Sequence, residues 1–289
     1  MLKIKTPLSV PKNKKKEYEQ NYLNLTNKTG NLLLIAGDQK VEHLNADFFG
    51  PGISLEDASP KHLFDIAANS HGGVLATHLG FIARYGHNYP QLPYIVKING
   101  KSNLGLNEEK DSSALWWTIE DVVKFKKDSG LKIGGVGYTV YLGTKYEAEM
   151  LKEAAQMTFA AHQAGLLSII WMYPRGKKIN EDNIHTIAGG AGVAGALNAD
   201  FVKIKYPYQA KDKKKAANDF KEAILAAGET KIICVGGDKR SEQEMLEFLK
   251  LQIEISGSKG LAIGRNLHQR SLKDASSLAQ KMAKIIFKK

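Results

Sequence analysis

A lysine inside an apolar run is the first residue of this sequence that could do chemistry. Lys203 lies in residues 199–206, ADFVKIKY, a run that is typical of a strand buried on both faces. Because a desolvated ammonium is costly, such a lysine is paired, extends to solvent or has a chemical role. Burial and a neighbouring cation lower the pKa of a lysine, and a neutral amine forms Schiff bases with carbonyls. We therefore interpret Lys203 as a candidate nucleophile, although most lysines are solvated surface charges.

Lys205 lies two residues further on and has two alternative roles. If the strand continues, its side chain is on the same face as that of Lys203. It could then be the second cation that lowers the pKa of Lys203. It could instead contact a phosphate group of the substrate, and the sequence leaves both alternatives open.

The elements that position Lys203 alternate regularly along the chain. The predicted strands are residues 32–36, 73–76, 94–98, 133–137, 167–172, 201–204, 231–235 and 260–263. The predicted helices are residues 60–70, 118–128, 145–164, 180–197, 211–227, 242–255 and 272–287. This alternation predicts parallel βαβ units, and about eight of them in 289 residues predict a (β/α)8 TIM barrel.

The alternative fold and the division of the chain depend on other segments. A doubly wound open sheet is the alternative, but residues 37–40, GDQK, are not the G-x-G-x-x-G loop that such a sheet carries after its first strand. Residues 100–115 are interpreted as a long loop or insertion between the third and fourth units. We divide the chain into a basic N-terminal arm, residues 1–30, and one barrel domain, residues 31–289.

Polar and aromatic residues gather where the predicted strands end, which is where a barrel builds its active site. The candidate residues at these ends are Asp38, His43, Trp171, Tyr173, Lys203 and Lys205. Asp38 could also be a turn or capping residue, and Tyr173 a packed aromatic.

The last two strands end in glycine, which predicts a site for an anion. Gly236 and Gly237 follow the seventh strand, and Gly264 and Arg265 follow the eighth. Backbone N–H groups at a helix start bind phosphate, and an arginine adds a fork of donors. A phosphate held there lies beside the sixth strand, so the pattern indicates a phosphorylated carbonyl compound held against the amine of Lys203.

Composition limits the other classes of function. The formal net charge of +11 favours anionic partners. Seven lysines among residues 1–30 predict a basic, partly extended arm, which is most simply a solvated tail, with a nucleic-acid contact or an oligomer contact as the alternatives. The sequence shows neither a secretory signal nor a membrane-spanning run, and the single cysteine, Cys234, excludes an internal disulfide. We expect a soluble cytoplasmic protein. The sequence lacks the G-x-S-x-G elbow of serine acyl chemistry and the HExxH spacing of a local metal site, so only a metal site with ligands from distant strands, which leave no local signature, stays open.

The residues at the strand ends resemble a known family. The similar segments are residues 38–43 (DQKVEH), 136–143 (VGYTVYLG), 171–176 (WMYPRG), 200–206 (DFVKIKY), 236–237 (GG) and 262–269 (AIGRNLHQ). Together they resemble the archaeal-type class I fructose-bisphosphate aldolases, a group of Schiff-base aldolases that includes the DhnA-like enzymes. Two segments depart from the usual pattern of this family. Residues 38–40 are DQK where many members have DHG, and Pro207-Tyr208-Gln209 replaces a small acidic turn.

The resemblance implies a metal-independent lyase without a cofactor, acting on fructose 1,6-bisphosphate as a homo-oligomer. It implies that Lys203 forms the Schiff base, that Tyr173 transfers protons, and that Asp38 and Trp171 assist. Phosphate is then held by Gly236, Gly237, Gly264 and Arg265, with Lys205 and His43 as further substrate-binding candidates.

Three alternatives remain. The chain could be a related Schiff-base or transaldolase-like enzyme for another ketose phosphate. A nucleic-acid-binding protein is suggested by the charge but lacks a recognition motif. A barrel that has lost catalysis would not be expected to keep the combination of Lys203, Tyr173 and Asp38.

Overall fold

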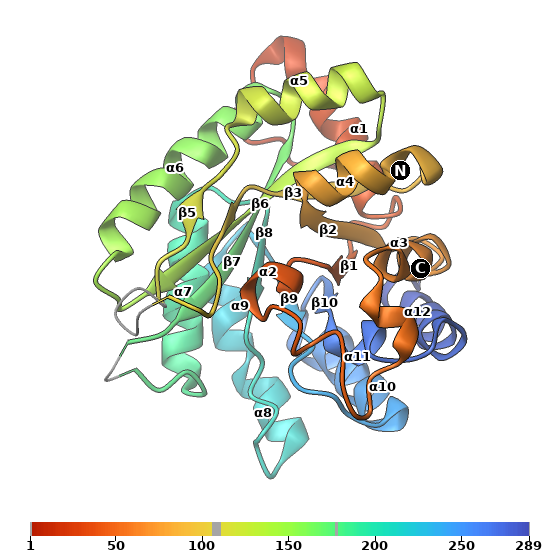
Figure 1. The fold of residues 1–289 in the computed structure, drawn as a ribbon. Helices are drawn as coiled ribbons and strands as arrows, with labels where there is room; N and C mark the ends of the chain where they lie inside the picture. Colours follow the sequence, from red (N-terminus) through yellow and green to blue (C-terminus); the bar gives the residue numbers. More distant parts are fainter. Residues whose placement is uncertain (1, 106–110, 177–178, 289) are drawn as a thin grey trace.

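The strands of the chain form a closed parallel barrel, as the alternation of elements predicts. The computed structural model describes residues 2–105, 111–176 and 179–288. The barrel strands, in chain order, are β1 (Leu32–Ala36), β2 (Val74–His78), β3 (Tyr94–Lys97), β6 (Ile133–Leu142), β7 (Leu167–Pro174), β8 (Phe201–Ile204), β9 (Lys231–Val235) and β10 (Gly260–Ile263). They close in the order β1-β10-β9-β8-β7-β6-β3-β2, which confirms the (β/α)8 TIM barrel (Figure 1).

Helices follow the strands, and most of them lie around the outside of the barrel, whereas the short α2 (Gln39–Glu42) lies over its middle in this view (Figure 1). They are α2 (Gln39–Glu42), α3 (Lys61–Ala68), α4 (Leu79–Tyr85), α5 (Ile119–Ser129), α6 (Glu147–Gln163), α7 (Ile184–Ala196), α8 (Lys213–Asp219), α9 (Lys221–Ala227), α10 (Glu242–Lys250), α11 (Arg265–His268) and α12 (Leu272–Ile286). Shorter segments are η1 (Lys12–Lys14), η2 (Leu55–Ala58), η3 (Gly86–Asn88) and the π-helical η4 (Leu251–Ser256). Among the helices in the described ranges, none is long and apolar enough to cross a lipid bilayer.

Local sequence explains where several helices begin and end. Thr118 caps α5 through a capping box with Asp121, and Gly130 ends it with φ of +67°, a conformation that glycine adopts without strain. The single helix predicted over residues 211–227 is wrong, because α8 and α9 are separated at Phe220. Phe220 is fully buried, and its ring centroid lies 4.9 Å from that of Tyr206.

The alternation of side chains along each strand separates two apolar clusters. Leu34 and Phe201 belong to the cluster that fills the barrel, whereas Leu33 and Val202 pack in the cluster shared with the outer helices. Lys203 follows Phe201 by two residues, so its side chain continues the inward-facing series. The inward series of each strand thus ends in a group of side chains at the carboxyl-terminal mouth of the barrel.

The basic N-terminal segment is more ordered than a solvated tail. Helix α1 (Lys15–Leu25) packs against the amino-terminal end of the barrel, where Tyr18 and Leu25 are buried. The Tyr18 hydroxyl donates a hydrogen bond to the buried carboxylate of Asp200, just before β8. A Cβ on Gly134 would lie 2.9 Å from Leu25, so this glycine makes room for the helix. The expectation of a solvated tail is therefore wrong for residues 15–25.

A two-stranded ribbon follows β3. Strands β4 (Asn99–Gly100) and β5 (Ala114–Leu115) pair antiparallel, so the insertion predicted over residues 100–115 folds back on itself. Residues 106–110 of this insertion lie outside the described part of the chain.

Candidate active site

A pocket of about 130 Å³ opens at the carboxyl-terminal ends of the strands. It brings together most of the residues that the sequence nominates. Its lining includes Asp38, His43, Tyr173, Lys203, Gly236, Gly237, Gly264 and Arg265, together with Gln39, Glu42, Lys101, Tyr141 and Arg175. A larger cavity of about 680 Å³ lies at the amino-terminal end beside α1, and none of the candidate residues lines it.

Lys203 is at the base of this pocket and is only 4% exposed. Its Nζ lies 5.1 Å from the ring centroid of Trp171, the residue paired with it on β7. Burial lowers the pKa of Lys203, but interactions with Tyr173, Asp38 and Glu42 raise it by more, so the pKa lies above the ordinary lysine value. The expected lowering of this pKa is therefore wrong for the ligand-free chain, because the interactions with these three neighbours together outweigh desolvation.

Two carboxylates near the pocket respond differently to this environment. Burial raises the pKa of Asp38, but Lys203, Lys97 and His78 lower it by more, so Asp38 is held ionised. The pKa of Glu42 is raised, chiefly by burial and by the charge of Asp38. Asp38 Oδ1 is buried without a hydrogen-bond partner among the described residues, so a ligand hydroxyl could donate to it.

Tyr173 ends the inward-facing series of β7 and stacks with Tyr141, with ring centroids 5.8 Å apart. Burial raises the pKa of Tyr173, although the charge of Lys203 opposes this effect, so its hydroxyl is protonated at neutral pH. Tyr173 and Lys203 both line the pocket, and a carbonyl compound bound there meets an amine and a phenol together.

Lys97 is a second buried lysine, and the sequence did not lead us to include it among the candidate site residues. It is fully buried at the end of β3, and its Nζ donates to the backbone oxygen and to Oδ1 of Asn99, both at 2.6 Å. Burial lowers the pKa of Lys97 to about 8, with Glu42 and Asp38 opposing this shift and Lys203 adding to it. Lys97 is thus the second cation near Lys203. Its apolar strand, residues 94–98, carried the same signal as that of Lys203.

Lys205 does not line the pocket. Strand β8 ends at Ile204, so the alternation that would bring Lys205 inward stops before it. Its Nζ pairs instead with Asp182 at 3.0 Å and Glu181 at 3.7 Å.

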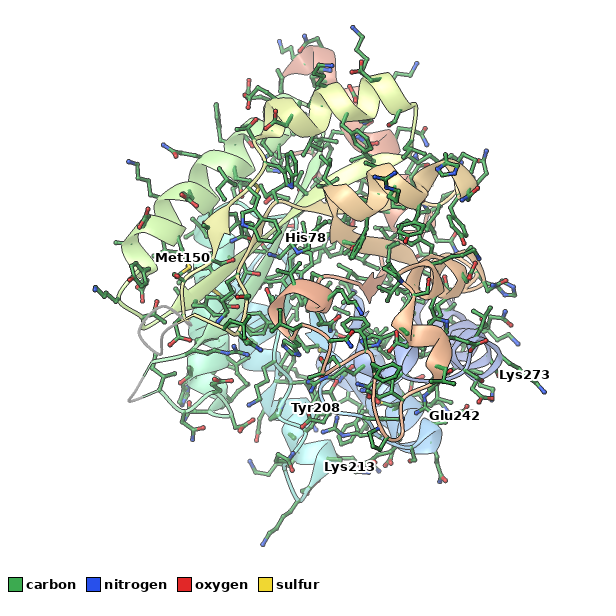
Figure 2. The ribbon with its side chains drawn as sticks, in the orientation of Figure 1. His78, Met150, Tyr208, Lys213, Glu242 and Lys273 are labelled. Carbon is green, nitrogen blue, oxygen red and sulfur yellow. The ribbon has the colours of Figure 1, made fainter. Side chains whose placement is uncertain are left out.

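His78 is another buried group that sequence reasoning missed. It ends β2 and lies toward the middle of the molecule in Figure 2, whereas Lys213 and Lys273 lie at its edge. Its ring stacks on Trp116 with centroids 4.7 Å apart, and both ring nitrogens are buried without hydrogen-bond partners in the part of the chain described. Burial and the charge of Lys97 lower the pKa of His78 to about 4, so the ring is neutral at pH 7.

The glycine-rich side of the pocket lies across Lys203 from Tyr173. Gly237 has φ of +67°, which favours glycine, and a Cβ on Gly264 would lie 2.1 Å from the Gln39 side chain. Arg265 pairs with Asp238 at 3.1 Å. His43 Nδ1 lies 2.5 Å from Asp47 Oδ2. Arg265 thus lines the pocket together with Gly237 and Gly264.

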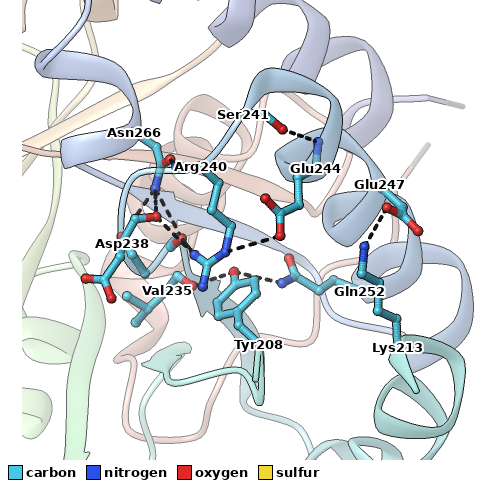
Figure 3. A network of polar contacts seen from close by, with 12 residues as sticks. Tyr208, Lys213, Val235, Asp238, Arg240, Ser241, Glu244, Glu247, Gln252 and Asn266 are labelled. Atoms are coloured by element: carbon cyan, nitrogen blue, oxygen red, sulfur yellow. Dashed lines mark hydrogen bonds and ion pairs between the residues drawn. The ribbon is translucent and has the colours of Figure 1, made fainter. Parts of the chain in front are cut away.

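Polar contacts brace the loop that carries Gly236 and Gly237 (Figure 3). The Asn266 side-chain amide donates to the carbonyl oxygens of Gly237 and Asp238, at 3.2 and 2.8 Å. At the start of this loop, the Tyr208 hydroxyl donates a hydrogen bond to the carbonyl oxygen of Val235, the last residue of β9, at 2.6 Å. Tyr208 belongs to Pro207-Tyr208-Gln209, the segment that departs from the family pattern. This unusual segment therefore helps to hold the loop of Gly236 and Gly237 in place.

Among the residues with described positions, no group of three or more His, Cys, Asp or Glu side chains is arranged to hold a metal ion. The chemical groups that the pocket does present are an amine, two carboxylates, two phenols and several cations.

A (β/α)8 barrel with a buried lysine at the strand ends, beside a tyrosine and carboxylates, defines a class of enzymes that can bind a carbonyl compound as a Schiff base. Residues 32–270 match the sequence model of the DeoC/LacD family aldolases. The chain belongs to this family and is an aldolase.

Individual relatives agree with this assignment. The chain is 52% identical over 270 residues to the fructose-bisphosphate aldolase/6-deoxy-5-ketofructose 1-phosphate synthase of Methanocaldococcus jannaschii, covering 93% of this chain and 86% of the relative. Its fold matches a fructose-bisphosphate aldolase from Slackia heliotrinireducens with a TM-score of 0.93 and 44% identity, over 99% of this chain and 90% of that one.

A third comparison concerns chemistry. The fold matches an archaeal fructose-1,6-bisphosphate aldolase with a TM-score of 0.79 and 28% identity, over 93% of this chain and 99% of that one. In that structure the catalytic lysine is covalently bound to the carbinolamine intermediate of the substrate. These relatives confirm the resemblance to archaeal-type class I aldolases.

Proposed function

We propose that this chain is a class I fructose-bisphosphate aldolase, which reversibly cleaves fructose 1,6-bisphosphate to dihydroxyacetone phosphate and glyceraldehyde 3-phosphate. The observation that carries the proposal is Lys203, buried at the base of a pocket that also contains Tyr173 and Asp38. The names of the relatives with 52% and 44% identity support the substrate.

The first half of the reaction forms the Schiff base. Lys203 must lose a proton before it attacks, because its pKa is raised in the ligand-free pocket. The neutral amine then adds to the C2 carbonyl and gives a carbinolamine, which loses water to become an iminium. Asp38, ionised and with a free oxygen, orients the substrate hydroxyls or accepts their protons.

The second half cleaves the carbon–carbon bond. The proton of the C4 hydroxyl passes through the Tyr173 hydroxyl to the Asp38 carboxylate as the C3–C4 bond breaks, and the electron pair of that bond moves into the iminium to give an enamine. Glyceraldehyde 3-phosphate leaves. The enamine is protonated at C3, and water hydrolyses the resulting iminium to release dihydroxyacetone phosphate and free Lys203. Trp171 packs beside Lys203 and limits the positions that its amine can adopt.

The glycine-rich side of the pocket is suited to the phosphate on C1. Carbon C1 is bonded to C2, so this phosphate must lie close to Lys203. Strand β9 is the neighbour of β8, and β10 is next in the barrel. We assign Gly236, Gly237, Gly264 and Arg265 to this phosphate, with His43 at the same rim.

Steady-state cleavage assays test the proposal. Purified enzyme is offered fructose 1,6-bisphosphate, and the release of glyceraldehyde 3-phosphate is followed with a coupled dehydrogenase. We expect turnover by the wild type and none by Lys203→Met. Turnover that survives in Lys203→Met, or its complete absence in the wild type, contradicts the proposal.

A second candidate is an aldolase for a ketose that carries one phosphate. The relative with 52% identity is named for a 1-phosphate product as well as for fructose bisphosphate, which favours this reading. Both reactions need Lys203 and a site for a C1 phosphate. A panel of ketose mono- and bisphosphates distinguishes them, because only a dedicated bisphosphate enzyme discriminates strongly against the monophosphates.

The assembly and location of the enzyme are further proposals. We expect a cytoplasmic homo-oligomer whose partner is a phosphorylated sugar, with neither a membrane nor a nucleic acid as its main partner. Light scattering during size-exclusion chromatography tests the assembly, and a monomer would contradict it. The arm of residues 1–30 and the barrel of residues 31–289 remain our division of the chain.

A further inference from the structure

A cavity of about 680 Å³ lies at the amino-terminal end of the barrel, at the other end from the pocket of Lys203. Its walls are the N-terminal arm, the loop before β1, and the residues that precede or begin β8, β9 and β10. Small-molecule sites in proteins have volumes of roughly 300–1,000 Å³, so this cavity is large enough for an organic ligand. The proposed function uses only the opposite end of the barrel.

Lysines from two parts of the chain line this cavity. They are Lys3 and Lys5 in the arm, Lys231 at the start of β9, and Lys259 just before β10. The backbone of Lys259 is held on both sides. Its N–H donates to the carbonyl oxygen of Ile232 at 2.7 Å, and its carbonyl oxygen accepts from the N–H of Leu32 at 2.8 Å. The barrel itself therefore fixes where the chain presents Lys231 and Lys259.

The charges of Lys231 and Lys259 lie close together without a counter-ion. Within the described ranges of the chain, neither ammonium group makes an ion pair or a hydrogen bond. Burial lowers the pKa of Lys231, the charge of Glu229 opposes this shift, and the charge of Lys259 adds to it. An anion bound between the two lysines removes this repulsion.

Tyr22 adds a hydrogen-bond donor to the same cavity. Its side chain is only 6% exposed, and its ring stacks with that of Phe201 at a centroid distance of 6.1 Å. Its hydroxyl lies 3.6 Å from the place of a Cβ on Gly30, another lining residue, and has no hydrogen-bond partner among the residues described. Burial and the charge of Asp200 raise the pKa of Tyr22, so this hydroxyl keeps its proton.

We propose that this cavity binds a small organic phosphate, with Lys231, Lys259 and the Tyr22 hydroxyl as its phosphate-binding groups. A phosphate ester carries about two negative charges near pH 7 and three acceptor oxygens. It accepts a hydrogen bond from Tyr22 and neutralises both ammonium groups at once. This inference goes beyond the proposed function and does not depend on it.

An exposed ion pair at the edge of the cavity opposes this binding. Lys5 Nζ lies 2.6 Å from Glu229 Oε1, with the two side chains 74% and 75% exposed. Glu229 also acts on Lys231, whose charged form it favours. A bound phosphate competes with this carboxylate for both lysines. Removal of the Glu229 charge should therefore strengthen phosphate binding, an effect of opposite sign to that of removing a lysine.

Acetylation of individual lysines tests the site directly. The wild type is treated with an N-hydroxysuccinimide ester of acetate, with and without glycerol 3-phosphate at constant ionic strength, and mass spectrometry follows each lysine. This probe has no carbonyl group, so Lys203 cannot capture it. At about 10 mM probe we expect Lys231 and Lys259 to react about threefold more slowly, as for a dissociation constant in the millimolar range. Lys250, exposed on α10 and outside the cavity, should keep its rate, and glycerol should protect none of them.

Variants identify the binding groups, and each is read at a lysine that it leaves in place. Lys231→Met, read at Lys259, and Lys259→Met, read at Lys231, should raise the half-protecting probe concentration about tenfold. Tyr22→Phe keeps the aromatic ring and should raise it about three- to tenfold. Glu229→Gln should lower it about two- to fivefold. Lys250→Met is the matched control and should leave it unchanged.

The outcomes separate this inference from its rivals. Equal acetylation rates with and without glycerol 3-phosphate in the wild type contradict the site. Undiminished protection in Lys231→Met, Lys259→Met and Tyr22→Phe, with wild-type circular dichroism, also contradicts it. Protection by an RNA oligonucleotide but not by glycerol 3-phosphate would make this surface a nucleic-acid contact and overturn the proposal. None of these results depends on whether the chain cleaves fructose 1,6-bisphosphate.

Discussion

Lys203 and Trp171 occupy paired positions on β8 and β7, and the lysine Nζ lies 5.1 Å from the indole ring centroid. The indole reaches this position because Gly137, on β6, has no side chain. A Cβ on Gly137 would lie 2.3 Å from the Trp171 ring. The position of the candidate nucleophile is therefore set across three neighbouring strands.

Gly137→Ala should displace Trp171 and disturb Lys203. Overpacking a buried site costs about 1–3 kcal/mol of unfolding free energy, and the shifted indole should lower kcat/KM at least tenfold. Denaturant unfolding and cleavage assays measure the two effects. Gly189→Ala is the control, because a Cβ there meets nothing within 4 Å. Normal activity in Gly137→Ala would contradict the role of Trp171.

Asp38→Asn should shift the pH dependence of Schiff-base formation to lower pH. The charge of Asp38 raises the pKa of Lys203, so its removal lowers that pKa and leaves more neutral amine at a given pH. The measurement is the rate of cyanoborohydride trapping with dihydroxyacetone phosphate between pH 5 and 10, with the remote Asp128→Asn as control. A shift to higher pH, or none, would show that Asp38 does not stabilise the ammonium.

Tyr173→Phe should separate Schiff-base formation from bond cleavage. Loss of a general acid or base typically costs about 10²–10⁴ in rate, so kcat for fructose 1,6-bisphosphate should fall by that factor. Trapping of Lys203 should persist, because the amine itself is unchanged. Tyr146→Phe, outside the pocket, should be close to the wild type. A fall in kcat of less than tenfold would remove Tyr173 from the proton-transfer step.

Chelators should leave the activity unchanged. In the proposed reaction the iminium takes the electron pair from the broken C3–C4 bond, so no Lewis acid is needed. Cleavage rates before and after dialysis against EDTA should agree within about twofold. Loss of activity that a divalent cation restores would point to a different class of aldolase.

Much of the barrel could be predicted because strands buried on both faces have a clear apolar signal. The bounds of β1, β8, β9 and β10 match the predicted ranges. Strand ends in a parallel barrel meet at one mouth, and this rule brings Asp38, Tyr173 and Lys203 into one pocket.

Features that depend on long-range contacts escaped prediction. The lysine-rich composition of residues 1–30 obscured the apolar positions of α1. The partner of its buried Tyr18, Asp200, lies 182 residues away in the sequence. Lys205 was expected beside Lys203 because alternation was carried one residue past the end of β8. Lys97 stands in the apolar run of residues 94–98, which the sequence shows, but its proximity to Lys203 depends on the closure of the barrel.

Covalent trapping of Lys203 tests the central claim most directly. Wild-type enzyme is reduced with borohydride in the presence of fructose 1,6-bisphosphate, digested and analysed by mass spectrometry. Reduction with ligand should leave an adduct of the sugar phosphate, or of its dihydroxyacetone phosphate half, on the peptide that contains Lys203. An adduct on another lysine such as Lys97, or no adduct in an enzyme that cleaves the substrate, would contradict the proposed mechanism.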